Sequence, residues 1–281
     1  MYQQMLRKIR LNGQSESTLA NYGRSLAHLS LYFECTPLAL SDEQINDYLL
    51  LLRDRQNPSL SYFKHTVYGL RYSFRLVGRE DRAIRLPSIK RLNSLPVVLS
   101  REECRRLFRS SKLLKHRILL TLAYSAGLRI SEVVNLRQAD IDFDRMQIHI
   151  RQSKYNKDRY VPLSRYMAQG LKKYYDGCSP KEWVFNGHGP GSPFSQRGAQ
   201  WVMKSCVKSA GITKKVSMHT LRHSYATHLL EDGLDLYSIQ KLLGHAHVST
   251  TLVYLHVAKT LPQRAHSPLD TLYPQTDAVK T

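Results

Sequence analysis

Apolar side chains recur at three- and four-residue steps through the N-terminal third of the chain, a pattern typical of amphipathic helices. The first such stripe follows Ser15 and ends near Thr36. The second follows the capping-box pattern Ser41–Gln44, and the third runs from Leu60 to Val77. Their apolar positions are Leu19, Tyr22, Leu26 and Leu29; Ile45, Tyr48, Leu49 and Leu52; and Phe63, Val67, Leu70 and Phe74. The sequence therefore predicts a helical N-terminal domain.

The helical pattern is interrupted between residues 85 and 96, where two prolines stand among basic residues. Proline disfavours helix at the residue before it, so this stretch predicts a connection between domains. We expect a helical domain at residues 1–86, a linker at 87–96 and a second domain at 97–259. The basic linker residues Lys90 and Arg91 are candidates for contacts along a run of phosphates.

The second domain opens with another capping-box pattern, Ser100–Glu103. A strongly apolar helix is predicted from about His116 to Ala126, and it stops at Gly127. A short amphipathic segment, Ser131–Leu136, follows that glycine. The domain therefore begins as a helical one.

Alternating apolar and polar residues predict a small sheet in the middle of the second domain. The chain turns at Ser153–Lys157 and returns at Tyr160–Leu163, which makes a hairpin. The alternating apolar residues are Met146, Ile148 and Ile150. Trp183–Phe185 is a candidate for a further short strand, and Gly187–Pro193 for a loop. The remainder is mostly helical, so the predicted fold class is mainly α with a small antiparallel β-sheet.

Composition adds a large positive charge to this picture. The chain has 281 residues, with 42 Lys and Arg against 22 Asp and Glu, and its formal net charge is +20. Hydrophobic residues make up 42%, enough to fill ordinary cores, so the charge does not indicate disorder. Such a surplus indicates a polyanionic partner, nucleic acid before an anionic membrane surface. No apolar run approaches the roughly 18 residues of a membrane span.

The charge is unevenly distributed. Residues 1–47 carry four basic and five acidic residues, whereas residues 53–91 carry ten basic and three acidic ones. Opposite the apolar stripe of the third predicted helix, Lys64, Arg71 and Arg75 alternate with tyrosines. Basic groups between aromatic side chains suit contacts to phosphates and sugars, although an ordinary solvated face has the same appearance. We take these three residues as candidate nucleic-acid contacts.

Neither cysteine nor histidine spacing indicates a metal site. The four cysteines lie far apart without a C-x-x-C pair, which favours reduced thiols in a cytosolic protein. His219 and His223 have the i, i+4 spacing of a zinc pair, but Thr220 stands where the zinc-protease pattern has glutamate. We therefore expect no bound metal.

Four motifs in the C-terminal domain, taken together, resemble the signature of the tyrosine recombinases, the family of phage integrases, Xer recombinases and integron integrases. They are Ala-Gly-Leu-Arg-Ile-Ser-Glu-Val at 126–133, His-Thr-Leu-Arg-His at 219–223, Leu-Gly-His at 243–245, and Tyr254 nine residues after His245. The resemblance covers nearly the whole chain, since the helical N-terminal domain is similar to the family's core-binding domain.

The resemblance implies a site-specific recombinase that cleaves and rejoins DNA without a metal, ATP or other cofactor. Tyr254 would attack a phosphodiester, leaving a 3′-phosphotyrosyl link and a free 5′-hydroxyl. Arg129 and Arg222 would bind the non-bridging oxygens, and Lys154, in the hairpin, would protonate the departing oxygen. The family commonly has glycine on either side of this lysine, whereas Ser153 and Tyr155 flank it here.

The remaining motif residues have supporting roles in the family. His219 would assist the tyrosine or the phosphate, His245 would donate to the phosphate, and Glu132 would brace the site from behind. Lys157 competes with the hairpin lysine of the motif and is otherwise a candidate DNA contact. His223 and His228 are expected to be structural.

The same resemblance implies partners: double-stranded recombination sites, and a homotetramer assembled on them in the bacterial cytoplasm at the nucleoid, with no membrane association. An accessory DNA-bending protein is left open by the sequence. Residues 260–281 would form a tail that docks on a neighbouring subunit through Leu269, Leu272 and Tyr273, with a frayed terminus as the alternative. Alternative functions are type IB topoisomerase-like relaxation, a non-catalytic DNA-binding regulator, and a zinc-dependent nuclease.

Overall fold

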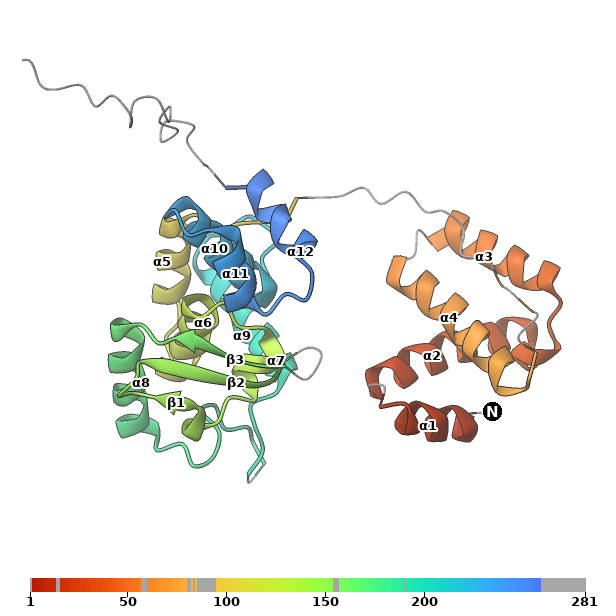
Figure 1. Cartoon of the computed structure of the whole chain (residues 1–281), viewed down its shortest axis with the longest axis horizontal. Helices are drawn as coiled ribbons and strands as arrows, with labels where there is room; N and C mark the ends of the chain where they lie inside the picture. Colours follow the sequence, from red (N-terminus) through yellow and green to blue (C-terminus); the bar gives the residue numbers. More distant parts are fainter. Residues whose placement is uncertain are drawn as a thin grey trace, which may run out of the picture. The chain divides into compact units, whose positions relative to one another are not determined.

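The computed structural model describes residues 2–13, 16–56, 60–79, 82, 84, 95–153, 157–189 and 191–258. The chain divides into two compact units, Met1–Asn93 and Ser94–Thr281, each with its own buried apolar cluster (Figure 1). The boundary falls inside the stretch 87–96 in which we expected a linker. Lys90 and Arg91 lie outside the described residues. The predicted fold class, mainly α with a small antiparallel sheet, is confirmed.

The N-terminal unit is helical throughout its described residues. α2 lies along α4, and α1 packs against both. The bounds are α1 (Tyr2–Leu11), α2 (Glu16–Phe33), the 3-10 turn η1 (Pro37–Ala39), α3 (Asp42–Gln56) and α4 (Leu60–Leu76). The core of the unit contains the apolar stripes that the sequence predicts.

Local signals set the helix ends in this unit. The predicted capping box is present at the start of α3: the Ser41 N–H donates to Oε1 of Gln44 at 2.9 Å, and the Gln44 N–H donates to the Ser41 hydroxyl at 3.1 Å. α4 ends at Leu76, one residue before Val77, which is 43% exposed rather than part of the stripe. α2 ends at Phe33, before the Thr36 that we expected.

The first helix, α1, was not predicted from the sequence. Its buried apolar residues are Met5 and Ile9, one helical turn apart in an otherwise polar segment. Two such positions are too few to establish a helical period. The helix is stabilised by packing on α2 and α4, which is a tertiary effect.

The C-terminal unit surrounds the apolar helix α6 with other helices and a small sheet. α6 packs against both α10 and α8, and this explains why its residues are apolar on most sides. The α-helices are α5 (Arg101–Arg109), α6 (Leu114–Ser125), α7 (Ile130–Val134), α8 (Arg165–Cys178), α9 (Gln196–Ser209), α10 (Met218–Glu231), α11 (Leu236–Leu243) and α12 (Ser249–Leu252), and the 3-10 turns are η2 (Gln138–Asp140) and η3 (Val253–His256). Among the described residues, no helix is long and apolar enough to cross a membrane.

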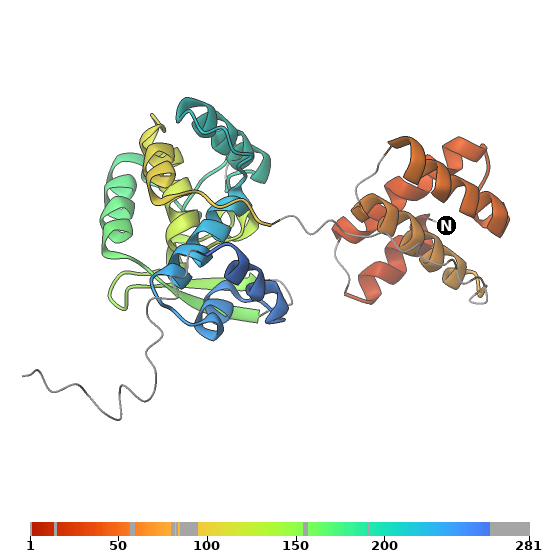
Figure 2. The ribbon, with the colours of Figure 1, turned by 90° about the horizontal axis from the view of Figure 1, so that it is seen from above.

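The sheet is an antiparallel meander in the order β1-β2-β3. Its strands are β1 (Ile141–Asp142), β2 (Gln147–Ser153) and β3 (Lys157–Pro162). Ile148 pairs with Val161, and Ile150 with Arg159, so these four side chains share one face. α11 packs against β3, and Figure 2 shows the green strands beside the blue C-terminal helices.

Two details of the predicted sheet are corrected. Met146 lies before β2 with a positive φ of 53°, because it belongs to the turn that joins β1 to β2. Trp183–Phe185 forms no strand: Trp183 makes an isolated bridge with Arg137, and the Val184 N–H donates to the Leu136 carbonyl at 2.8 Å. The short strand β1 was not predicted, since two residues are too few to show alternation.

Candidate active site

A tight turn after α6 positions the first functional arginine. Gly127 has a φ of +60°, and a Cβ placed on it would lie 2.4 Å from Cδ1 of Tyr225. Only glycine fits such a backbone and such a close approach. The chain therefore leaves α6 directly against α10, and Arg129 follows as the residue that precedes α7.

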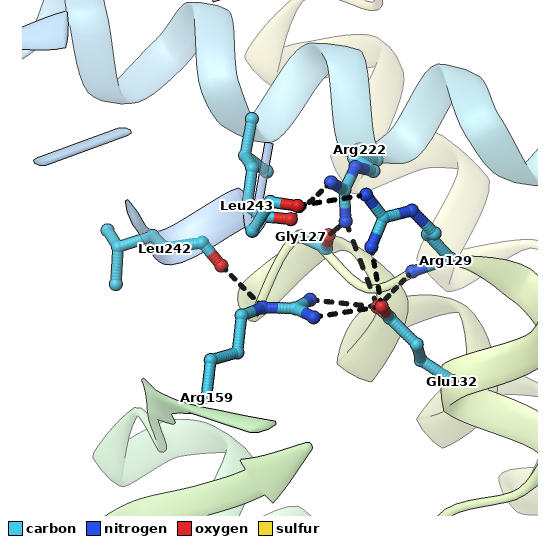
Figure 3. Close-up of polar contacts among 8 residues, drawn as sticks. Gly127, Arg129, Glu132, Arg159, Arg222, Leu242 and Leu243 are labelled. Carbon is cyan, nitrogen blue, oxygen red and sulfur yellow. Dashed lines mark hydrogen bonds and ion pairs between the residues drawn. The ribbon is translucent and has the colours of Figure 1, made fainter. Parts of the chain in front are cut away.

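Glu132, in the first turn of α7, binds two arginines. Its carboxylate accepts from the Arg129 N–H at 2.8 Å and from Nη1 of the same arginine at 2.7 Å. It also accepts from both terminal nitrogens of Arg159 at 2.8 Å. Figure 3 shows the guanidinium groups of Arg129, Arg159 and Arg222 converging on this carboxylate, whose distance to Nη1 of Arg222 is 3.7 Å.

The ionised form of Glu132 is strongly stabilised. Burial alone would raise its pKa, since its side chain is only 5% exposed. The hydrogen bonds and charge of Arg159, together with the backbone N–H and charge of Arg129, outweigh burial and lower the pKa of Glu132 to about 2. The site therefore contains a permanent carboxylate.

Arg222, on α10, is 0% exposed and is held by main-chain carbonyls (Figure 3). Its Nη1 donates to the Gly127 carbonyl at 2.8 Å and its Nη2 to the Leu243 carbonyl. Its Nε has no hydrogen-bond partner among the described residues. Burial, followed by the nearby charge of Arg129, lowers the pKa of Arg222 to about 9, so the guanidinium stays protonated at neutral pH.

Main-chain carbonyls at the end of α11 orient Arg129, Arg222 and Arg159. The Gly244 carbonyl accepts from Nη2 of Arg129 at 3.3 Å, next to the Leu243 carbonyl that binds Arg222. Nε of Arg159 donates to the neighbouring Leu242 carbonyl at 2.8 Å. Unsatisfied carbonyls at a helix C-terminus carry partial negative charge, so this end of α11 suits three cations.

Three histidines lie beside the arginines. Burial, followed by the charges of Arg222 and Arg129, lowers the pKa of His219 and lowers that of His245 to about 3. Burial, then His219 and Arg222, lowers the pKa of His223 to about 4. All three rings are therefore neutral at pH 7. Nδ1 of His245 lies 2.9 Å from the Thr251 hydroxyl.

Tyr254, in η3, completes the cluster. Its side chain is 1% exposed, and its hydroxyl lies 3.1 Å from Nδ1 of His223. The His245 ring is nearly parallel to it, with centroids 6.4 Å apart. Burial raises the pKa of Tyr254, while the charges of Arg222 and Arg129 act in the opposite direction. The phenol is therefore protonated and close enough to the arginines to feel their charge.

The structure thus gathers most of the residues singled out from the sequence. The residues found together are Arg129, Glu132, Arg222, His219, His245 and Tyr254. Lys154 lies outside the described residues, and nothing is described of the Lys157 side chain. On α4, Arg75 is exposed, Lys64 is half-buried, and Nε of Arg71 donates to the Ile84 carbonyl at 2.8 Å.

Sequence reasoning missed Arg159 and did not place His223 among the candidate site residues. Arg159 stands in register with the apolar face of the hairpin, where an arginine is unexpected, and this signal could have singled it out. His223 was expected to be structural, and its Nδ1 lies 3.1 Å from the tyrosine hydroxyl. His228 does fit a structural role, since its Nδ1 lies 2.8 Å from the hydroxyl of Tyr124.

Among the described residues, no three His, Cys, Asp or Glu side chains are grouped so that they could hold a metal ion.

The site combines a buried tyrosine with two cationic guanidinium groups and neutral histidines, and it follows a helical N-terminal unit. This combination defines the tyrosine recombinase class of DNA strand-breaking and rejoining enzymes.

Comparison with known proteins gives the same class and the family. Residues 97–260 match the model of the phage integrase family, and residues 1–83 match the phage integrase N-terminal SAM-like domain. Because the first match alone spans more than half of the chain, the chain belongs to the phage integrase family.

Several relatives of the chain are tyrosine recombinases of the Xer type. The chain is 32% identical to tyrosine recombinase XerD of Listeria monocytogenes serovar 1/2a over 271 residues, 88% of this chain and 90% of the relative. It is 40% identical to tyrosine recombinase XerA of Thermococcus kodakarensis over 196 residues, 68% of this chain and 69% of the relative. The crystal structure of XerH bound to its palindromic difH substrate after cleavage shares the fold, with a TM-score of 0.71, 23% identity and coverage of 90% of this chain and 78% of that one.

Proposed function

We propose that this enzyme binds double-stranded recombination sites and exchanges DNA strands through a covalent link between Tyr254 and the 3′-phosphate. The observation that carries the proposal is the burial of this tyrosine within the influence of Arg129 and Arg222, both oriented by the end of α11. Such an arrangement surrounds a nucleophile with the donors that a phosphodiester needs.

The charge of the cluster matches that of the reaction. Arg129, Arg159 and Arg222 carry three positive charges, and the ionised Glu132 cancels one of them. The remaining two equal the charge of a phosphodiester when a second negative charge develops on its oxygens. Fixed cations placed in advance stabilise a transition state more than water does, since they need no reorganisation.

Each group then has a role in the step. As the Tyr254 oxygen bonds to phosphorus, the bond to the 5′-oxygen breaks, and Lys154 supplies the proton that makes the departing hydroxyl. Arg129 and Arg222 donate to the non-bridging oxygens, and the free Nε of Arg222 is a donor still available for one of them. The phosphotyrosyl bond conserves the energy of the broken one, so another 5′-hydroxyl can later attack it.

The hydrogen bonds of the neutral histidines indicate which ring nitrogen carries the proton. If the Thr251 hydroxyl donates to Nδ1 of His245, the proton of that ring resides on Nε2, which then donates to the phosphate. His219 lies beside His223 with ring centroids 4.5 Å apart and assists the same groups. Glu132 holds Arg129 in place.

Basic residues outside the cluster would hold the DNA. On α4 these are Lys64, Arg71 and Arg75; Lys90, Arg91 and Lys157 belong to the same set. Contacts of this kind supply affinity that falls steeply with salt and carries little sequence information. By its resemblance to the family, the enzyme would act as a homotetramer on two sites, with residues 260–281 docked on a neighbouring subunit.

The test is capture of a covalent adduct. The wild-type chain is incubated with a pool of nicked random-sequence duplexes, and covalently bound DNA is recovered and sequenced. Wild type should yield an adduct and an enriched sequence, and Tyr254→Phe should yield none. Tyr124→Phe is the matched control, since it removes a hydroxyl that also pairs with a histidine Nδ1 on α10 but lies outside the cluster. An adduct that persists in Tyr254→Phe would exclude this nucleophile.

The same captured sequence separates recombination from topoisomerase-like relaxation. A supercoiled plasmid with two copies should give deletion or inversion products. Relaxation without such products would support the topoisomerase alternative.

A further inference from the structure

The Tyr254 hydroxyl must lose a proton as it attacks phosphorus, and the motif residues leave open which group receives it. Among the described residues, the hydrogen-bond partner of this hydroxyl is Nδ1 of His223, at 3.1 Å. His219, one turn earlier on α10, lies against the His223 ring in a T-shaped arrangement, with centroids 4.5 Å apart and planes at 79°. His223 therefore contacts both His219 and Tyr254.

We propose that His223 is a catalytic residue: its Nδ1 accepts the Tyr254 proton during cleavage and returns it during rejoining. The inference deepens the proposed strand-exchange function and rests on it. It assigns to the second histidine of the His-Thr-Leu-Arg-His motif a proton transfer that the first does not make in this geometry.

The surroundings of His223 suit an acceptor. The titratable groups that face it are His219 and Arg222 on its own helix and Tyr254 from η3. A neighbouring guanidinium and burial both disfavour the imidazolium, so the ring is neutral and offers one lone pair. With its proton on Nε2, Nδ1 accepts from the phenol, which is the direction that cleavage requires.

The same surroundings keep the nucleophile inactive until DNA is bound. The pKa of His223 is lowered to about 4 and that of Tyr254 is raised, so the proton remains on the tyrosine in the free enzyme. A bound phosphodiester brings negative charge next to Arg222, and this charge offsets the repulsion that disfavours the imidazolium. Proton transfer then accompanies formation of the oxygen–phosphorus bond.

The balance of the step is closed. The O–H bond of Tyr254 breaks and its proton moves to Nδ1 of His223. The phenolic oxygen then bonds to phosphorus, and the bond between phosphorus and the 5′-oxygen breaks. Lys154 gives its proton to the departing 5′-oxygen. Rejoining reverses every transfer, so neither residue is changed after a full cycle.

The experiment uses His223→Asn on the nicked duplex recovered with wild type. Asparagine places an amide near the position of Nδ1, so it retains a hydrogen bond but cannot take the proton. Single-turnover cleavage at neutral pH should fall by about 10²–10³, within the usual range for general base catalysis, while duplex binding is unchanged. The rate should also rise about tenfold per pH unit between about pH 7 and pH 9, because hydroxide replaces the lost base, whereas wild type stays nearly flat.

A substrate with sulfur in the bridging 5′ position separates the two proton transfers. Its thiolate leaves without a proton, so it should restore cleavage by Lys154→Ala but not by His223→Asn. The matched control is His228→Asn, which removes the other histidine–tyrosine contact of α10 and should keep both the rate and the pH profile of wild type.

Three results would overturn the proposal. Wild-type cleavage by His223→Asn would show that no proton is transferred to this ring, and slow cleavage with a flat pH profile would show that it only positions the tyrosine. Rescue of His223→Asn by the sulfur substrate would place the ring on the leaving-group side. His223→Gln repeats the series if the asparagine variant unfolds below the assay temperature. Absence of any adduct with wild type would instead reject the strand-exchange function.

Discussion

The two halves of the site solve the problem of burying polar groups in opposite ways. On one side, Glu132 and the arginines keep their charges and pair them, with distances of 2.7 and 2.8 Å. On the other side, His223, His245 and Tyr254 are largely enclosed and uncharged, since burial lowers the pKa of the two histidines and raises that of the tyrosine. The paired half carries fixed charges, and the neutral half contains the groups to which we assign the proton transfer.

The difference follows from what each half must do. A field that stabilises the phosphate has to be present before the substrate arrives, so its charges are permanent and anchored by carbonyls. A proton acceptor has to be uncharged before the step, and burial beside cations keeps the histidines uncharged until the negative charge of a bound phosphate favours protonation. Changes that break the pairing or restore charge should therefore affect the two halves differently.

The largest effect is expected from Glu132→Gln. It removes the counter-charge of Arg129 and Arg159, whose side chains are 21% and 9% exposed, and breaking a largely buried pair costs about 3–5 kcal/mol of unfolding free energy. Both tryptophans of the chain, Trp183 and Trp201, belong to this unit, so their fluorescence during urea unfolding measures it specifically. Glu102→Gln is the control, because its partner Arg105 is 62% exposed and such pairs contribute about 0–1 kcal/mol. A loss below about 1 kcal/mol in Glu132→Gln would contradict a paired half.

An intermediate effect on folding stability is expected from lowering the pH. The two halves differ in the pH at which their contribution to stability begins to be lost. In the unfolded chain, histidine becomes protonated below its ordinary pKa of 6.5. In the folded chain, the pKa of His223 is about 4 and that of His245 is about 3, so both stay neutral to lower pH. The unfolded state then binds more protons, so stability falls as pH decreases below 6.5. Glu132 has the same sign, but its contribution is lost only between its ordinary 4.5 and about 2.

The measurement is the urea midpoint of tryptophan fluorescence from pH 7.5 downward. His223→Asn with His245→Asn should make the decline near pH 5–6 less steep, and Glu132→Gln should do so only at lower pH. A decline that is unchanged by the histidine variants would mean that the neutral half carries no linked protons.

The smallest effect is expected from Thr251→Val, which removes one neutral hydrogen bond to Nδ1 of His245. A bond of this kind contributes about 0.5–1.5 kcal/mol, so stability and cleavage should both fall modestly. Thr227→Val is the matched control: that side chain is also buried on the same unit, and its hydroxyl has no hydrogen-bond partner among the described residues. It should be neutral or slightly stabilising, and an equal loss in both variants would mean that only packing was measured.

How far the sequence predicts the site depends on how local each signal is. The helices of the apolar stripes, the capping boxes at Ser41 and Ser100, and the hairpin were predicted because their causes lie within a few residues. Helix α1 and strand β1 were missed because each is short and is stabilised by distant partners. The motifs singled out Tyr254 as the candidate nucleophile, with two candidate arginines, because their order and spacing are distinctive even without contacts.

The sequence by itself determined most of the elements, the excess of positive charge, the family and the candidate residues for the chemistry. Only the tertiary structure decided how these residues are paired. Arg159 is 27 positions from Glu132, and His223 is 31 from Tyr254, so no periodicity along the chain connects them. The physical reason is that hydrogen bonds, desolvation and pKa shifts depend on which groups share a small buried volume, and folding alone brings those groups together.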